Sequence, residues 1–151
     1  MWFLFCSVLI AIDQLIKWVT VDKLSVIGTF PVIKNVFHLT YVENTGAAFG
    51  MFSNGTMLLA VVTAVEIGII MYFFLKKTNS KMWLIRLSLM MIVAGATGNL
   101  IDRIFRGFVV DMFDFCLINF YVFNFADVCI CIGAALMAYH ILFLHEKQAD
   151  K

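Results

Sequence analysis

The sequence predicts an α-helical integral membrane protein with four transmembrane helices and a small β-sheet outside the membrane. Of its 151 residues, 63% are hydrophobic and only 14% are charged, and the mean hydropathy is +0.97. Soluble domains carry about a quarter charged residues, and a chain of this size has too little interior to bury so much apolar surface. Lipid is the solvent that remains. Because no Pro-, Gly- or Ser-rich linker divides the chain, we expect 1–151 to form one membrane domain.

Four segments have the length and composition of a membrane-spanning helix, which needs roughly 20 mostly apolar residues. These segments are 2–21, 56–75, 82–101 and 126–144. The stretch 26–55 between the first two is different, because its residues 37–43 alternate in polarity and favour β-structure. We expect this outer segment to form a short sheet that lies on the membrane surface.

The orientation follows from the basic residues near the helix ends. Cytoplasmic loops of membrane proteins carry an excess of lysine and arginine. The lysines that follow the second and fourth predicted helices are Lys76, Lys77, Lys81, Lys147 and Lys151. Both termini are therefore expected in the cytoplasm, and segments 26–55 and 102–125 are expected on the outer side.

Two aspartates, Asp111 and Asp127, adjoin apolar segments on that outer side. A carboxylate beside hydrocarbon is costly, so intramembrane acids usually have a function. Two carboxylates that share a site cannot both ionise easily, so one of them holds a proton near neutral pH. The ionised one can then deprotonate water while the other polarises a carbonyl, which is peptide hydrolysis by an aspartyl pair. The alternative is that each aspartate caps or flanks a helix.

Three asparagines are expected in the same outer layer. Asn44 precedes Thr45-Gly46, so it is either a turn residue or a contact for a substrate. Asn124 is either the cap of the fourth helix or a hydrogen-bonding partner of a substrate. Asn99 belongs to the end of the third helix.

Asn99, Asp102 and Arg103 have the spacing i, i+3, i+4, so they share one helix face. Arg103 is expected either to pair with Asp102 or to hold a backbone carbonyl or phosphate oxygen. Gly95 and Gly98, one turn earlier, favour close helix packing.

Two further charged features lie within the predicted helices. Asp13 and Lys17 are spaced i, i+4 in the favourable acid-first order, which predicts an ion pair with Lys17 snorkelling towards the interface. Glu66 lies roughly 15 Å into the second helix at helical rise. It is expected to be protonated or to pair with a polar group inside the bundle, and no function is predicted for it.

The composition also limits the partners. The four cysteines form no Cys-x-x-Cys motif and have no histidines at metal-ligand spacing, so neither a metal site nor a cofactor is predicted. His38 is interpreted as an interfacial residue. A net charge of +1 argues against nucleic acid as a partner.

Five blocks of sequence, in order, resemble bacterial lipoprotein signal peptidase, also called signal peptidase II, a family of membrane aspartyl peptidases. The resemblance extends from Asp13 to about Gly133. The blocks are Asp13-Gln14 with Lys17, and segments 44–50, 95–103, 109–111 and 123–127.

The resemblance implies four transmembrane helices, an outer β-cradle and a catalytic pair at Asp111 and Asp127. The supporting and substrate-binding positions that it implies are Asp13, Lys17, Asn44, Gly46, Asn99, Asp102, Arg103 and Asn124.

The family acts in the bacterial cytoplasmic membrane. The substrate that the resemblance implies is a prolipoprotein with a diacylglyceryl-modified cysteine, cut just before that cysteine. Similar enzymes need no metal and are blocked by globomycin. We expect a monomer whose remaining partner is membrane lipid.

Two other functions fit the composition. In a small proton-coupled transporter or channel subunit, Glu66, Asp13 and Asp127 would be relay acids. That function predicts acids spread across the membrane depth, whereas most of them cluster near the outer face. A non-catalytic scaffold that binds lipoprotein precursors would tolerate the loss of Asp111.

Overall fold

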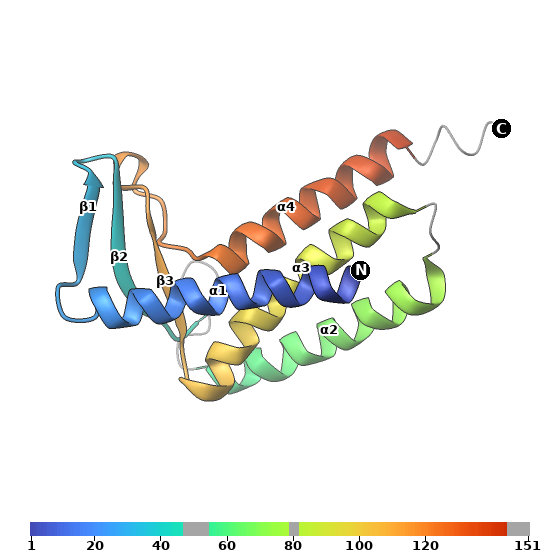
Figure 1. Cartoon of the computed structure of the whole chain (residues 1–151), viewed down its shortest axis with the longest axis horizontal. Helices are drawn as coiled ribbons and strands as arrows, with labels where there is room; N and C mark the ends of the chain where they lie inside the picture. The colour runs from blue at the N-terminus through green and yellow to red at the C-terminus, as the bar shows by residue number, and fades with distance from the viewer. Residues whose placement is uncertain (47–54, 79–81, 145–151) are drawn as a thin grey trace.

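The computed structural model describes residues 1–46, 55–78 and 82–144 of the chain. Within these ranges, four long helices run beside one another and a three-stranded sheet lies at one end of them (Figure 1). The helices are α1 (Trp2–Leu24), α2 (Thr56–Lys77), α3 (Trp83–Phe105) and α4 (Phe125–Tyr139). A π-helical segment, His140–Leu144, continues α4. Helices α1, α2 and α3, and α4 together with its π-helical continuation, are long and apolar enough to cross a membrane, so the predicted fold class is confirmed.

Helix α3 is the centre of the bundle and packs against α1, α2 and α4. Small residues on α3 permit this close approach. A Cβ atom at Gly95 would collide with the carbonyl oxygen of Ala126 in α4, and one at Gly98 would collide with the carboxylate of Asp13 in α1. The predicted packing role of these two glycines is therefore confirmed.

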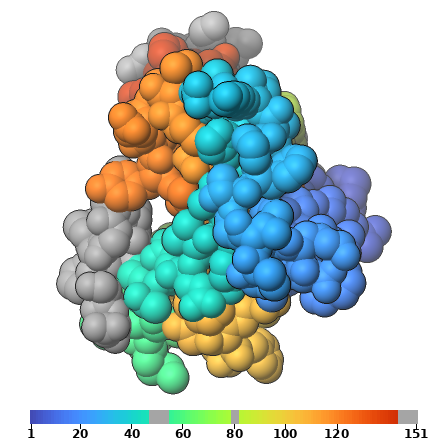
Figure 2. All heavy atoms as spheres, turned by 90° about the vertical axis from the view of Figure 1, so that its left-hand side faces the viewer, coloured from blue at the N-terminus to red at the C-terminus, as the bar shows by residue number. Residues whose placement is uncertain are grey.

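The sheet has the strand order β1-β2-β3, with both pairs antiparallel. Its strands are β1 (Thr29–Ile33), β2 (Phe37–Asn44) and β3 (Val109–Asp114). The first two form a hairpin inside the predicted outer segment. The third was not predicted, because it is a short run that pairs with β2 from far along the chain. Figure 2 shows β1 and β2 beside the orange segment that contains β3, covering one end of the helices.

The third helix is longer than predicted, since it ends at Phe105 and not near residue 101. Asp102 lies within its last turn and forms an i, i+4 ion pair with Arg106 (3.2 Å). Arg106 caps the helix, and Gly107 follows with a φ of +81°, the left-handed conformation typical of the residue after a helix cap. The chain then turns directly into β3.

Candidate active site

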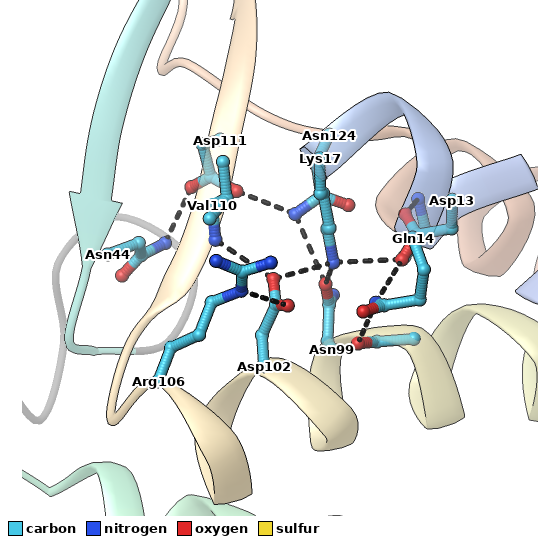
Figure 3. Close-up of polar contacts among 12 residues, drawn as sticks. Asp13, Gln14, Lys17, Asn44, Asn99, Asp102, Arg106, Val110, Asp111 and Asn124 are labelled. Carbon is cyan, nitrogen blue, oxygen red and sulfur yellow. Dashed lines mark hydrogen bonds and ion pairs between the residues drawn. The ribbon is translucent and has the colours of Figure 1, made fainter. Parts of the chain in front are cut away.

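The polar side chains of the molecule converge where α3, α4 and β3 meet, beside a cavity of about 840 Å³. Figure 3 shows Asn44, Asn99, Asp111 and Asn124 of this group, with the charged residues around them. The polar residues that line the cavity are Glu43, Asn44, Thr45, Gly46, Asn99, Arg103, Asp111, Tyr121, Asn124 and Asp127. Apolar residues of α4 and of segment 120–123 form much of the remaining wall. Both aspartates that the sequence indicates therefore face one cavity.

Asp111 lies in the middle of β3, opposite Val42 of β2, and is only 2% exposed. Its two carboxylate oxygens accept hydrogen bonds from two amide groups, Asn44 Nδ2 (2.9 Å) and Asn124 Nδ2 (2.6 Å) (Figure 3). The alternative that Asp111 caps or flanks a helix is wrong, since a strand carries it. Neutral donors orient this carboxylate without cancelling its charge.

Asp127 lies in the first turn of α4 and forms a capping box with Asn124. Its Oδ2 accepts from the backbone N–H of Asn124 (3.1 Å), and Asn124 Oδ1 accepts from the backbone N–H of Asp127 (3.0 Å). Its other oxygen, Oδ1, accepts from Asn99 Nδ2 (2.8 Å). The capping interpretations of Asp127 and Asn124 are thus confirmed, and Asn124 also connects Asp127 to Asp111.

The environment of Asp111 favours its protonated form. Burial raises the pKa of this carboxyl from its ordinary value to about 6. The hydrogen bonds from Asn44 and Asn124 oppose that shift, whereas the negative charge of Asp127 adds to it. The two carboxyls are therefore close enough to interact electrostatically, as a proton-sharing pair requires.

Lys17 of α1 is completely buried. Its Nζ contacts Asp13 Oδ2 (3.0 Å), Asp102 Oδ2 (3.1 Å) and Asn99 Oδ1 (2.8 Å). The predicted Asp13–Lys17 pair is confirmed, but the prediction that Lys17 snorkels is wrong. Three acceptors match the three N–H groups of the ammonium, so its charge has no need of water.

This network also orients the asparagines. Asn99 Oδ1 accepts from Lys17 and from Asn124 Nδ2 (3.2 Å), which leaves the amide nitrogen of Asn99 to donate to Asp127. Lys17 of α1 thereby orients the amide of Asn99 in α3, so that its N–H group points to Asp127 in α4.

The two carboxylates of the network tie separate elements together. Asp13 Oδ1 accepts from the backbone N–H of Ala126 (3.0 Å), one of the donors that every helix start leaves unpaired. Asp102 Oδ2 accepts from the backbone N–H of Val110 (3.1 Å), next to Asp111 in β3. These bonds set the positions of α4 and β3 relative to α1 and α3.

Arg103 does not pair with Asp102, which instead pairs with Lys17 and Arg106. Neighbouring residues of a helix point in different directions, so the guanidinium faces the cavity. There it donates to the carbonyl oxygen of Gly46 (3.4 Å), which is the second predicted alternative. Its Nε is buried without a partner in the described part of the chain.

Asn44 is a turn residue, as one of its two predicted roles requires, and it also bonds to Asp111. Its Oδ1 accepts from the backbone N–H of Gly46 (3.0 Å), as in an Asx turn, while its Nδ2 donates to Asp111. The rest of this sequence block, 47–50, lies outside the described residues.

The chain matches the family model described as Signal peptidase (SPase) II over residues 5–143. The chain belongs to the signal peptidase II family. Two relatives, both named lipoprotein signal peptidase, cover almost all of it. The protein of Fusobacterium nucleatum is 44% identical over 99% of this chain and 90% of its own length. That of Clostridioides difficile is 42% identical over 98% and 99%.

Solved structures agree with this membership. One described as a bacterial membrane enzyme structure, obtained by the in meso method at 2.3 Å resolution, superposes with a TM-score of 0.85. It is 29% identical and covers 99% of this chain and 91% of its own. As a signal peptidase II, the chain is an aspartic peptidase, which argues against the transporter and scaffold alternatives.

Sequence reasoning missed several residues of this signal peptidase II site. Gln14 donates from Nε2 to Asp13 Oδ2 and to the carbonyl oxygen of Gly98, both at 3.1 Å. Its place beside Asp13 in the first sequence block was the available signal. Segment 120–123, which lines the cavity, has no such signal, because its residues read as an ordinary apolar loop.

One alternative predicted that Glu66 pairs with a polar group inside the bundle, and the structure contradicts it. Its side chain is exposed, and no partner for it lies among the described residues. It lines a second cavity of about 240 Å³ together with Asn99, Arg103 and Asp127. Because those three residues line the larger cavity as well, both cavities reach Asp127.

Proposed function

We propose that Asp111 and Asp127 are the catalytic pair with which this signal peptidase II removes signal peptides from prolipoproteins. Removal of these signal peptides is the activity of the family to which the chain belongs. The observation that carries the proposal is the position of Asn124, whose one side chain is bonded to Asp111 and to the backbone of Asp127 beside a large cavity.

In the proposed reaction, the pair holds one proton and one water molecule. The ionised carboxylate takes a proton from the water, whose oxygen attacks the carbonyl carbon of the scissile peptide bond. The carboxylic acid donates a hydrogen bond to the carbonyl oxygen, where negative charge develops. When the tetrahedral intermediate collapses, a carboxyl of the pair returns a proton to the leaving amine. The proton belongs to the pair, so neither aspartate is assigned a fixed role.

The other polar residues are proposed to position the reactants. Asn44, Asn99 and Asn124 orient the carboxylates through neutral donors, so the pair keeps its negative charge. Arg103 is proposed to hold the substrate backbone, because its buried Nε has no partner in the described part of the chain. A guanidinium supplies several donors in a rigid plane, which suits peptide carbonyls.

The substrate is proposed to carry a diacylglyceryl-modified cysteine and to be cut just before it. The apolar wall of the large cavity supports a lipid-modified substrate. The second cavity supports it as well, because it lies beside α2 and reaches Asp127. The signal peptide would lie between the helices while the acyl chains stay in lipid.

We propose that the aspartate pair lies near the outer face of the bacterial cytoplasmic membrane, with both termini in the cytoplasm. Lys76 and Lys77 end α2 at the end of the bundle away from the sheet, and cytoplasmic ends are rich in such residues (Figure 1). A reporter fused to the C-terminus should be active in the cytoplasm only. Activity of that reporter on the outer side would reverse the orientation.

The experiment that tests the function uses the purified chain in detergent with a prolipoprotein, with and without the diacylglyceryl group. We expect cleavage of the modified substrate only, with a new amino-terminus at the lipidated cysteine by mass spectrometry. Activity should survive a metal chelator. Equal cleavage of both substrates would contradict the proposed lipid recognition, and no cleavage by folded protein would contradict the function.

The raised pKa of Asp111 predicts the pH dependence of the reaction. The pair must hold one proton, and that proton is lost as the pH rises through about 6. We therefore expect kcat/KM, which reports groups of the free enzyme, to fall about tenfold per pH unit above that value. A pH profile from 5 to 8 measures it.

The matched variant for this profile is Asn44→Ala. It removes a hydrogen bond that stabilises the Asp111 carboxylate, so the fall of kcat/KM should move to higher pH. A profile that is flat between pH 5 and 8, or that Asn44→Ala moves to lower pH, would contradict the assignment.

A further inference from the structure

Strand β2 begins and strand β3 ends at the same end of the sheet (Figure 1). Three residues with metal-binding side chains lie there. His38 of β2 is paired in register with Asp114 of β3. Cys116 follows two residues later, at the start of a short 3-10 helix, η2 (Cys116–Ile118). The imidazole, carboxylate and thiol ligand atoms of the three residues all lie within 4.8 Å of one another. All three side chains are half-buried.

The imidazole of His38 has a ring nitrogen without a partner. Its Nε2 is buried and has no hydrogen-bond partner among the described residues. A buried polar atom without a partner costs free energy, so such atoms are rare and often mark the position of a bound ion or water. One residue of the cluster therefore carries a buried nitrogen that an ion could satisfy.

The carboxylate of Asp114 is already oriented. Thr40, two residues after His38 in β2, donates from Oγ1 to Asp114 Oδ2 (2.9 Å). Thr29 of β1 donates in turn to Thr40 Oγ1 (3.3 Å). Hydrogen bonds of this kind, made to a ligand and not to the metal, are the usual support of a metal site.

We propose that His38, Asp114 and Cys116 bind one Zn²⁺ ion. Zinc takes imidazole, thiolate and carboxylate ligands together, and three protein ligands plus one water complete its tetrahedral shell. Mg²⁺ and Ca²⁺ prefer oxygen ligands, so the thiol and the imidazole argue against them. On binding, the Cys116 thiol gives its proton to the solvent, because the thiolate is the ligand.

The ion would act at a distance from the aspartate pair. It would join the start of β2 to the start of η2, and η2 leads into segment 120–123, which lines the substrate cavity. The proposed ligands do not line the cavity themselves, so the ion would stabilise the fold beside it and take no part in the chemistry at Asp111 and Asp127, and activity should survive its removal. Sequence spacing gives no sign of this site, because the histidine lies far along the chain from the other two ligands.

The test is a titration of the tag-free full chain in detergent, kept reduced, with Zn²⁺ by calorimetry and with Co²⁺ by absorption spectroscopy. We expect one ion per chain and a charge-transfer band from a Co²⁺–thiolate bond. His38→Asn, Asp114→Asn and Cys116→Ser should each weaken Zn²⁺ binding at least tenfold, and Cys116→Ser should also remove the band. The matched control is Cys131→Ser, which removes another free cysteine and should leave Zn²⁺ affinity unchanged.

Melting temperatures provide a second measurement. Zn²⁺ should raise the melting temperature of the native chain and of Cys131→Ser, because an ion that binds only the folded state stabilises it. It should not raise that of Cys116→Ser, whose melting temperature in chelator should equal the native value. The proposal is overturned if no Zn²⁺ binds at micromolar concentrations, or if the affinity is the same in the native chain and in Cys116→Ser. The Co²⁺ spectrum of the native chain decides the matter if His38→Asn does not fold.

Discussion

Replacement of Asp111 or Asp127 by asparagine is expected to lower kcat for a lipid-modified prolipoprotein about 100- to 10,000-fold, which is the contribution of a positioned general acid or base. An asparagine at either position can neither take a proton from water nor hold the proton that the pair shares. Removing one member should therefore cost nearly as much as removing both, because residues that act as a unit are not additive. Single-turnover kinetics of the two single variants and the double variant measure this directly.

Both replacements keep the size of the side chain, so the fold should survive. At position 127, the carbonyl oxygen of an asparagine can still accept the backbone N–H of Asn124, which preserves the start of α4. The control is Asp22→Asn, an aspartate near the end of α1 that is about half exposed and whose ion pair in the described part of the chain is with the exposed Lys23. It should retain full activity. If either site variant kept a tenth of the native kcat, the aspartate pair would not be the catalytic centre.

The prediction of the helices from sequence succeeded because hydrocarbon imposes a simple requirement. Each spanning segment must be about 20 residues long and apolar. Both ends of α2 were predicted to within two residues. The strand β3 was missed because its pairing with β2 depends on the path of the whole chain. That strand carries Asp111, whose position in a strand the sequence did not predict.

The side chains that support the site show a similar division. The i, i+4 spacing was enough to predict that Asp13 and Lys17 pair. It could not predict that Asp102 also reaches Lys17, because that contact joins two helices, and it therefore led to the wrong prediction of snorkelling. Asn124 had been given two alternative roles, and it is a helix cap that also bonds to Asp111. Sequence spacing indicates local contacts, whereas the bonds between elements require the fold.

The buried lysine is expected to have the largest effect on stability. Lys17→Met should lower the free energy of unfolding by about 3–5 kcal/mol, the usual cost of removing one partner from a buried ion pair. Methionine fills a similar volume, but Asp13 and Asp102 would then be two buried carboxylates without a cation between them. Thermal unfolding of the purified chain in detergent, followed by helix content, gives the expected fall in melting temperature.

Two matched variants separate charge from packing. Lys23→Met removes an exposed lysine of the same helix and should leave stability nearly unchanged, as expected for a surface pair. Neutralising both acids in the combination Lys17→Met, Asp13→Asn and Asp102→Asn should recover most of the lost stability, because no buried carboxylate then lacks a cation and the charge that loses its ion partner, on Arg106, is partly exposed. Without Lys17, the amide of Asn99 also loses the donor that directs its N–H group towards Asp127, so the recovered variant should stay slow. If Lys17→Met melted at the same temperature as Lys23→Met, the buried network would not hold these helices together.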